Sequence, residues 1–312
     1  MKFKSILILT LSFTIHSCKA QVNTSPDDPY QKSHPDQFAN YWYTGQAEIS
    51  RFELKQMRYG EIRSGEVVLI FVTEDFLVEE QVKKEYGNST ATSVLKLNFM
   101  KKFITGVYDY SIMTSTFTPI DYRKNPATLK TSFCSQDWCG QVFSQMNYRD
   151  RKLHYQIRSY FQAEGDEDVT VDATYTEDDV WNRMRLEPQT LPLGKIEMVP
   201  SMEFLRLKHK ELKAYPCEAN LFLQVNDQES GGEEFYSYQL YYPELDRQLS
   251  IQCESRFPFR ILSWKETWSA SSSTAQITEA ILTKSSKAPY WDQNGENEKA
   301  LRNSLGLKMN FD

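Results

Sequence analysis

The stretch QVFSQMNYRDRKLHYQIRSYF, residues 141–161, decides the fold class of this chain. Apolar side chains alternate with polar ones on both sides of the polar tetrad RDRK, a pattern typical of a β-hairpin. A four-residue loop places Tyr148 opposite Leu153. The same register places Met146 opposite Tyr155, so the larger apolar side chains of both strands share one face of the predicted sheet.

A second segment, 238–253, repeats this plan. The turn-and-return text DRKLHYQ at 150–156 matches DRQLSIQ at 246–252 in four of seven positions. Two interpretations stay open. Either the chain contains two similar halves, about 37–175 and 190–312, or two independent hairpins need the same turn chemistry.

Composition indicates a globular β-rich domain. The chain has 312 residues, of which 40% are hydrophobic and 13% aromatic, enough for a packed core. Its net charge of −6 is spread along the sequence, so the basic footprint of a nucleic-acid-binding protein is missing. We therefore predict one β-rich domain, 37–312, with no nucleic-acid partner.

Strand-like patterns follow one another along the chain, and helical patterns appear only at 177–186 and 296–305. This order predicts a mainly β fold, a long curved antiparallel meander that forms a half-barrel or barrel-like sheet. One helix lies between the halves and a short one at the C-terminus. The run VVLIFV at 67–72 is apolar on both faces, so both faces should be covered. Strands are predicted at 47–57, 66–73, 95–99, 108–114, 129–133, 195–199, 202–208, 219–225, 236–242, 249–254, 259–268 and 275–284.

The N-terminus has the pattern of an export signal. Two lysines precede an apolar run at 6–15, which is too short to span a bilayer. The following IHSC at 15–18 resembles the lipobox of bacterial lipoproteins. That resemblance implies a signal peptide, 1–17, and diacylglyceryl attachment to Cys18 with chains of the palmitate type. The alternative is an ordinary secretory signal that is cleaved near residues 20 and 21.

Residues 18–36 are predicted to be a lipidated cysteine followed by a polar tether that contains three prolines. Anchoring through several acyl chains is stable. No Asp follows Cys18, and by resemblance to known sorting signals this favours the outer membrane, facing the periplasm.

Four cysteines remain after Cys18, an even number for an oxidising compartment. Three connectivities can join them, and we favour Cys134 with Cys139 and Cys217 with Cys253. The alternative is that they are free thiols that serve as small core hydrophobes.

Residues that could carry catalysis or bind metal show no recognisable partner in the sequence. His34 lies in the tether, His154 on the polar face of a predicted strand, and His209 in a basic run. The acidic runs 166–168 and 233–234 lack the ligand spacing of a calcium loop and are interpreted as solvated turns. We therefore name no catalytic residue, no metal ligand and no cofactor.

One resemblance covers most of the chain. YTGQAEI at 43–49, RYGEI at 58–62, VTEDF at 72–76, QDWCG at 136–140 and ILSWKE at 261–266 resemble an uncharacterised family of Bacteroidota lipoproteins. Members are sometimes labelled septum formation inhibitor, a name that belongs to cytoplasmic α/β nucleotide pyrophosphatases with a Ser-x-Ser-Pro-Arg-Arg signature. The chain lacks this signature, so the activity is not carried over.

These observations favour a lipoprotein that binds an amphiphile or an envelope protein on a curved sheet at the outer membrane. One alternative is a structural or assembly lipoprotein without a ligand. The other is the nucleotide pyrophosphatase that the family label implies.

The anchor gives the first testable prediction. Cys18→Ala removes the acylated side chain, so the variant should leave the membrane fraction, whereas the unchanged chain should stay in it. Fractionation and metabolic labelling with palmitate measure both effects. A variant that fractionates and acylates as before would contradict the lipobox interpretation.

Overall fold

The computed structural model describes residues 20–21, 35–122, 126–162, 164–225, 232–269 and 275–307. Cys18, the signal peptide and most of the predicted tether, His34 included, lie outside the described residues. Within the described ranges, none of the helices has the length and hydropathy of a membrane span.

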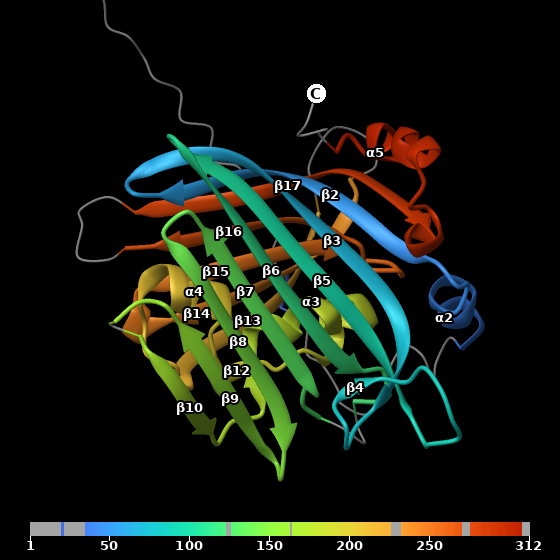
Figure 1. The fold of residues 1–312 in the computed structure, drawn as a ribbon, viewed down its shortest axis with the longest axis horizontal. Helices are drawn as coiled ribbons and strands as arrows, with labels where there is room; N and C mark the ends of the chain where they lie inside the picture. Colours follow the sequence, from blue (N-terminus) through green and yellow to red (C-terminus); the bar gives the residue numbers. More distant parts are fainter. Residues whose placement is uncertain are drawn as a thin grey trace, which may run out of the picture.

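A single large sheet, mostly antiparallel and not closed, dominates the protein (Figure 1). Its strands are β1 (Ala20–Gln21), β2 (Ala47–Arg58), β3 (Glu61–Leu77), β4 (Val82–Lys83), β5 (Thr92–Thr105), β6 (Tyr108–Pro119), β7 (Lys130–Asp137), β8 (Gly140–Arg149), β9 (Lys152–Ser159), β10 (Asp166–Val171), β11 (Tyr175–Thr176), β12 (Gly194–Val199), β13 (Tyr215–Val225), β14 (Glu234–Tyr242), β15 (Arg247–Glu254), β16 (Ile261–Trp268) and β17 (Gln276–Ala288). The helices are α2 (Pro35–Trp42), α3 (Glu177–Leu186), α4 (Met202–Lys208) and α5 (Lys299–Ser304), with short 3-10 turns at Pro188–Thr190, Pro243–Leu245, Tyr290–Asp292 and Glu296–Glu298.

The strand order follows the chain, as expected for a meander. From β10 the sheet runs through β9, β8, β7, β6 and β5 to β3 and β2, each strand antiparallel to the next. β2 then pairs with β17, and the sheet continues back through β16, β15, β14 and β13 to β12. Among the strands of the described ranges, the short β11 is the one that pairs in parallel, with β12. The predicted mainly β, curved antiparallel class is therefore confirmed.

The hairpin at 141–161 forms with the predicted register. Tyr148 pairs with Leu153 and Met146 with Tyr155. The loop is shorter than expected, because the residues on either side of Asp150 and Arg151 already pair with each other. Both turn residues adopt left-handed backbone angles, φ 51° and 61°, which is the geometry of a two-residue hairpin turn.

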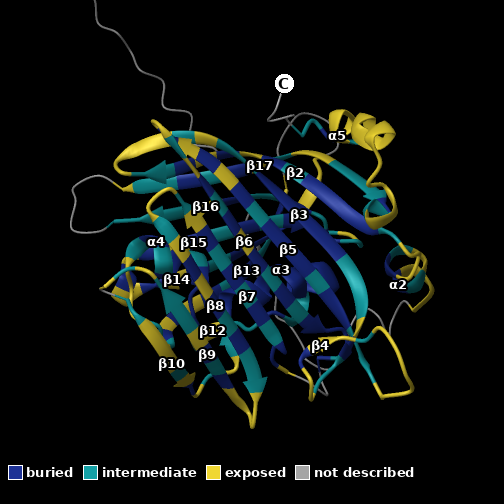
Figure 2. Ribbon diagram, viewed as in Figure 1, coloured by how far each residue is buried: buried dark blue, intermediate teal, exposed yellow. Residues whose placement is uncertain are grey.

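Helix α3 has the bounds that the sequence predicts, but its position is more central than expected. All ten of its residues are buried, including the charged ones. It contacts β5, β6 and β11, and the curved sheet wraps around it, so that dark buried segments surround the helix in Figure 2. The helix occupies the centre of the concave side of the sheet.

The outer face of the sheet is also covered in one region. Val68 and Ile70 on β3 form a small apolar cluster with Leu305, and Leu301 packs against it. This confirms that the apolar run of β3 is covered on both faces. The predicted C-terminal helix is divided into a 3-10 turn and α5, and Gly306 follows in the left-handed region with φ 68°.

Two predicted element assignments are wrong. Residues 202–208 form helix α4 and not a strand, because Ser201 caps the segment by accepting a hydrogen bond from the Phe204 backbone N–H at 3.3 Å. A short apolar run fits both the helical period of 3.6 residues and the strand period of two, and the N-terminal cap favours the helix. The tether was predicted to reach residue 36, yet α2 begins at Pro35.

The two expected disulfides are not formed, and all four described cysteines are free thiols. Cys217 lies on β13 and Cys253 on β15, with the whole of β14 between them. Cys134 faces Phe143 across β7 and β8, whereas Cys139 lies in the turn after Asp137. Cys217 and Cys253 are instead buried apolar side chains of the core.

Candidate functional site

The charged residues of α3 form ion pairs inside the sheet. Arg185 donates two hydrogen bonds to Glu48 on β2, Nη2 to Oε2 at 2.7 Å and Nη1 to Oε1, and neither side chain is exposed to solvent. The guanidinium carbon lies 4.8 Å from the ring centroid of Phe71. Burial alone would raise the pKa of Glu48, but the charge of Arg185 lowers it to about 2. The pair is therefore ionised and bidentate.

The first turn of α3 is fixed to the second half of the sheet. Glu177 accepts a hydrogen bond from Arg247 Nη2 on β15 at 2.8 Å and another from the Tyr242 hydroxyl at 2.9 Å. Arg247 also donates to Glu266 on β16 at 2.7 Å. One buried guanidinium therefore joins the helix to two strands.

Polar contacts on the other side of α3 reach β5 and β6. Asn182 donates to the Leu95 carbonyl at 3.0 Å and to the Thr118 hydroxyl at 2.9 Å. Asp179 accepts from the same hydroxyl and pairs with Arg183 one turn later. Helix α3 is thus hydrogen-bonded to strands from both halves of the chain.

Asp178 is the acidic residue of α3 without an ion-pair partner among the described residues. Burial, reinforced by the charge of Glu177, raises its pKa to about 8. Its Oδ2 accepts a hydrogen bond from the Met202 backbone N–H at 3.2 Å. The carboxyl therefore joins the start of α3 to the start of α4 in a neutral form at pH 7.

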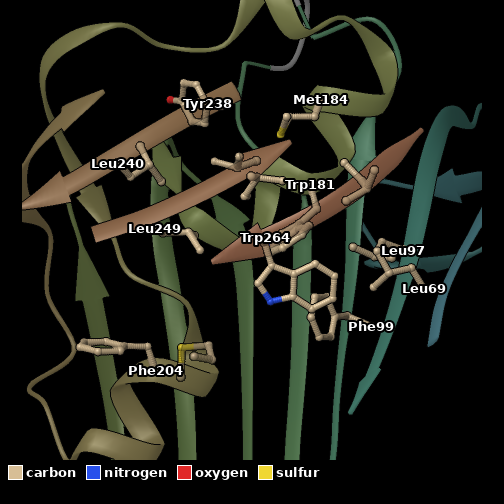
Figure 3. Packing of buried hydrophobic residues seen from close by; sticks show 14 of the residues in the cluster. Leu69, Leu97, Phe99, Trp181, Met184, Phe204, Tyr238, Leu240, Leu249 and Trp264 are labelled. Atoms are coloured by element: carbon tan, nitrogen blue, oxygen red, sulfur yellow. The ribbon is translucent and has the colours of Figure 1, made fainter. Parts of the chain in front are cut away.

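The space left beside α3 at the centre of the curved sheet is small. A cavity of about 50 Å³, the interior cavity, is lined by charged and aromatic side chains. Figure 3 shows why: Trp181 of α3 points toward Trp264 of β16 and Phe99 of β5, with ring centroids 5.2 Å from each. Such a volume holds about three to five water molecules. The centre of the concave face is therefore filled.

A larger hollow of about 500 Å³ lies on the concave side at the β8–β10 end of the sheet. We call it the α4 groove. Its apolar lining comes from the predicted hairpin, from neighbouring strands and from the region of α4: Phe133, Val142, Ile157, Val169, Leu205 and Leu212. Helix α4 separates this groove from the interior cavity, because its residues Glu203, Phe204 and Lys208 line the interior cavity instead.

The polar part of the α4 groove is centred on Glu164. Its Oε1 is 2.8 Å from His209 Nδ1 and 2.9 Å from Arg206 Nη1, and its Oε2 accepts from the Ser159 hydroxyl at 2.7 Å. The carboxylate lies between the serine and the histidine, so this arrangement does not activate the serine as a nucleophile. It is a charged network that fixes the polar side of the groove.

Sequence analysis singled out His209 but missed its partners, because Glu164 lies 45 residues earlier in the chain. The other candidates are separate. His154 contacts the Thr170 hydroxyl at 3.1 Å between β9 and β10, and the two acidic runs are exposed at strand starts. No cluster of three or more metal-ligating residues occurs in the described parts of the chain.

A further hollow of about 430 Å³ lies outside the sheet, between β2, β3 and β5 and the C-terminal segment. Its floor is the apolar cluster of Val68, Ile70 and Leu305. Three acidic and three basic side chains are among its lining residues, so neither charge prevails.

Comparison with known proteins adds no relative. No family model matches the chain, and neither the curated proteins nor the solved structures give a match. The resemblance to Bacteroidota lipoproteins therefore stays a prediction.

The Glu48–Arg185 pair predicts a large effect on stability. Glu48→Gln leaves a buried guanidinium without its counter-charge and should reduce the free energy of unfolding by about 3–5 kcal/mol. Glu279→Gln breaks the exposed pair with Lys55, 2.9 Å apart, and should reduce the free energy of unfolding far less, because solvent screens this pair. Urea denaturation measures the free energy of unfolding of both variants. Equal losses would contradict the conclusion that Glu48 and Arg185 form a buried, ionised pair.

Asp178 predicts a pH dependence. Its pKa rises from 3.8 to about 8 on folding, so between these values the folded protein holds a proton that the unfolded chain has lost. Stability from this group is complete below pH 3.8 and is lost as the pH rises toward 8. Between pH 5 and 8 the free energy of unfolding should therefore fall less in Asp178→Asn than in the unchanged protein, by a few kcal/mol, as measured by denaturation at each pH. Asp166→Asn, at an exposed site, should keep the original dependence.

Proposed function

We propose that this protein is a periplasmic lipoprotein, anchored in the outer membrane, that binds a single-chain amphiphile in the α4 groove. The observation that carries the proposal is the volume of about 500 Å³, in which apolar side chains make up half of the lining and a charged group lies beside them. Small-molecule sites are typically of about 300–1,000 Å³ with few polar groups. The interior cavity is too small for an acyl chain.

The polar group expected to hold the head of the amphiphile is Arg206. Its side chain is 9% exposed, and its guanidinium lies 4.4 Å from the Phe161 ring centroid. Nη1 is paired with Glu164, whereas Nε is buried without a hydrogen-bond partner among the described residues. A buried donor without a partner is costly, and an oxygen of a bound head group would satisfy it.

The filled interior favours a second candidate function. A sheet whose concave side is occupied by α3 and its ion pairs is also suited to a structural or assembly lipoprotein without a ligand. The two functions differ in whether the α4 groove is occupied. Native mass spectrometry of the chain expressed from residue 19 distinguishes them, because co-purified lipid is expected only for the first.

A matched pair of variants tests the groove. Ile157→Glu places a carboxylate in its apolar wall and should weaken binding of a fluorescent fatty acid by about tenfold or more, because the charge must be desolvated. Ile281→Glu makes the same change at a side chain that is 57% exposed and should leave binding unchanged. Equal affinities for both variants, or no binding by the unchanged chain, would contradict the proposal.

A further inference from the structure

Four cationic side chains line the interior cavity, and two of them have carboxylate partners. Lys101 pairs with Glu203, and Arg247 pairs with Glu177 and Glu266. These pairs account for three of the four acidic residues that line the cavity. The fourth, Asp178, accepts a backbone hydrogen bond instead.

Arg58 and Lys208 differ from the other two cations. Arg58 donates to the Leu207 carbonyl at 2.7 Å and to the Tyr110 hydroxyl at 3.1 Å, and Lys208 donates to the Gln276 side chain at 3.1 Å. All of these acceptors are neutral. Arg58 Nε is in addition buried without a hydrogen-bond partner among the described residues.

The positions of these two cations are fixed by their surroundings. Arg58 Nη1 donates a hydrogen bond to the backbone carbonyl of Leu207, the residue before Lys208. The two cationic groups therefore lie in one part of the cavity wall. The Lys208 ammonium stands 4.0 Å from the Trp268 ring centroid. Two cationic donors are therefore held in one part of the cavity wall, and neither is paired with a carboxylate among the described residues.

The charge balance points in the same direction. Burial lowers the pKa of Lys208 to about 8. The negative charge of Glu266 raises this pKa, and the positive charges of Arg58 and Arg247 lower it. Burial raises the pKa of Asp178 to about 8, so this carboxyl is neutral at pH 7, and the other lining residues are three carboxylates in ion pairs and four cationic side chains. Positive side chains therefore outnumber paired carboxylates in the described lining of the cavity.

We infer that the Arg58 and Lys208 end of the interior cavity binds a small oxyanion, either inorganic phosphate or the phosphate group of a larger molecule. Guanidinium and ammonium groups are the usual protein donors to such anions. The volume of about 50 Å³ admits about three to five water-sized groups, close to the size of a phosphate ion. This site is separate from the α4 groove and does not depend on amphiphile binding.

Isothermal titration of the full chain with inorganic phosphate, at constant ionic strength and pH 7, tests the inference. One binding site is expected. Lys208→Gln keeps a polar side chain but removes the charge, and should weaken phosphate binding by about tenfold or more. Lys195→Gln removes the same charge from an exposed position outside the cavity and should change the affinity by less than about twofold.

Arg58→Lys gives an independent variant, because it keeps the charge and removes the unpaired Nε; it should also weaken binding. Circular dichroism confirms that each variant is folded. Titration with glycerol phosphate separates the two sources of the anion: tighter binding than inorganic phosphate indicates a lipid head group, and weaker binding indicates the free ion. No phosphate binding by the unchanged chain, or equal weakening by Lys208→Gln and Lys195→Gln, would overturn the inference.

Discussion

Complete burial of α3 is the constraint on which the rest of this structure depends. A helix with the sequence EDDVWNRMRL brings three carboxylates and two guanidinium groups into the interior. Unpaired charges there would cost several kcal/mol each, so the surrounding strands must supply counter-charges at fixed positions. Glu48 does so from β2, and Arg247 from β15. The ion pairs thus require the first and second halves of the sheet to curve around one helix.

This arrangement decides where ligands can bind. Helix α3, with its own Trp181 packed against Trp264 of β16, fills the centre of the concave side and leaves the small interior cavity there. Helix α4 stands between that cavity and the larger α4 groove, with Lys208 lining one and Arg206 the other. One short helix therefore presents cations to two hollows of different chemistry, a small polar one and a larger apolar one.

The features that the sequence predicted well are those set by local pattern. The alternation around 150–156 fixed the hairpin register, and acidic residues followed by an apolar period of 3.6 fixed the bounds of α3. Contacts between distant residues could not be predicted this way. Glu48 and Arg185 are 137 positions apart, and an acidic residue in a strand is ordinarily exposed. The expected disulfides were wrong for the same reason, because cysteine number carries no information about which strands separate the thiols.

Native-state hydrogen exchange of the α3 amides tests the central claim most directly. If the ion pairs and the enclosing sheet hold α3 in place, its amides should exchange only when the whole domain unfolds. Their protection free energies should then equal those of β5 and β6 and the global value from urea denaturation. Exchange of α3 through a separate opening, several kcal/mol below that value, would show that the helix is an insert in a sheet that is stable without it.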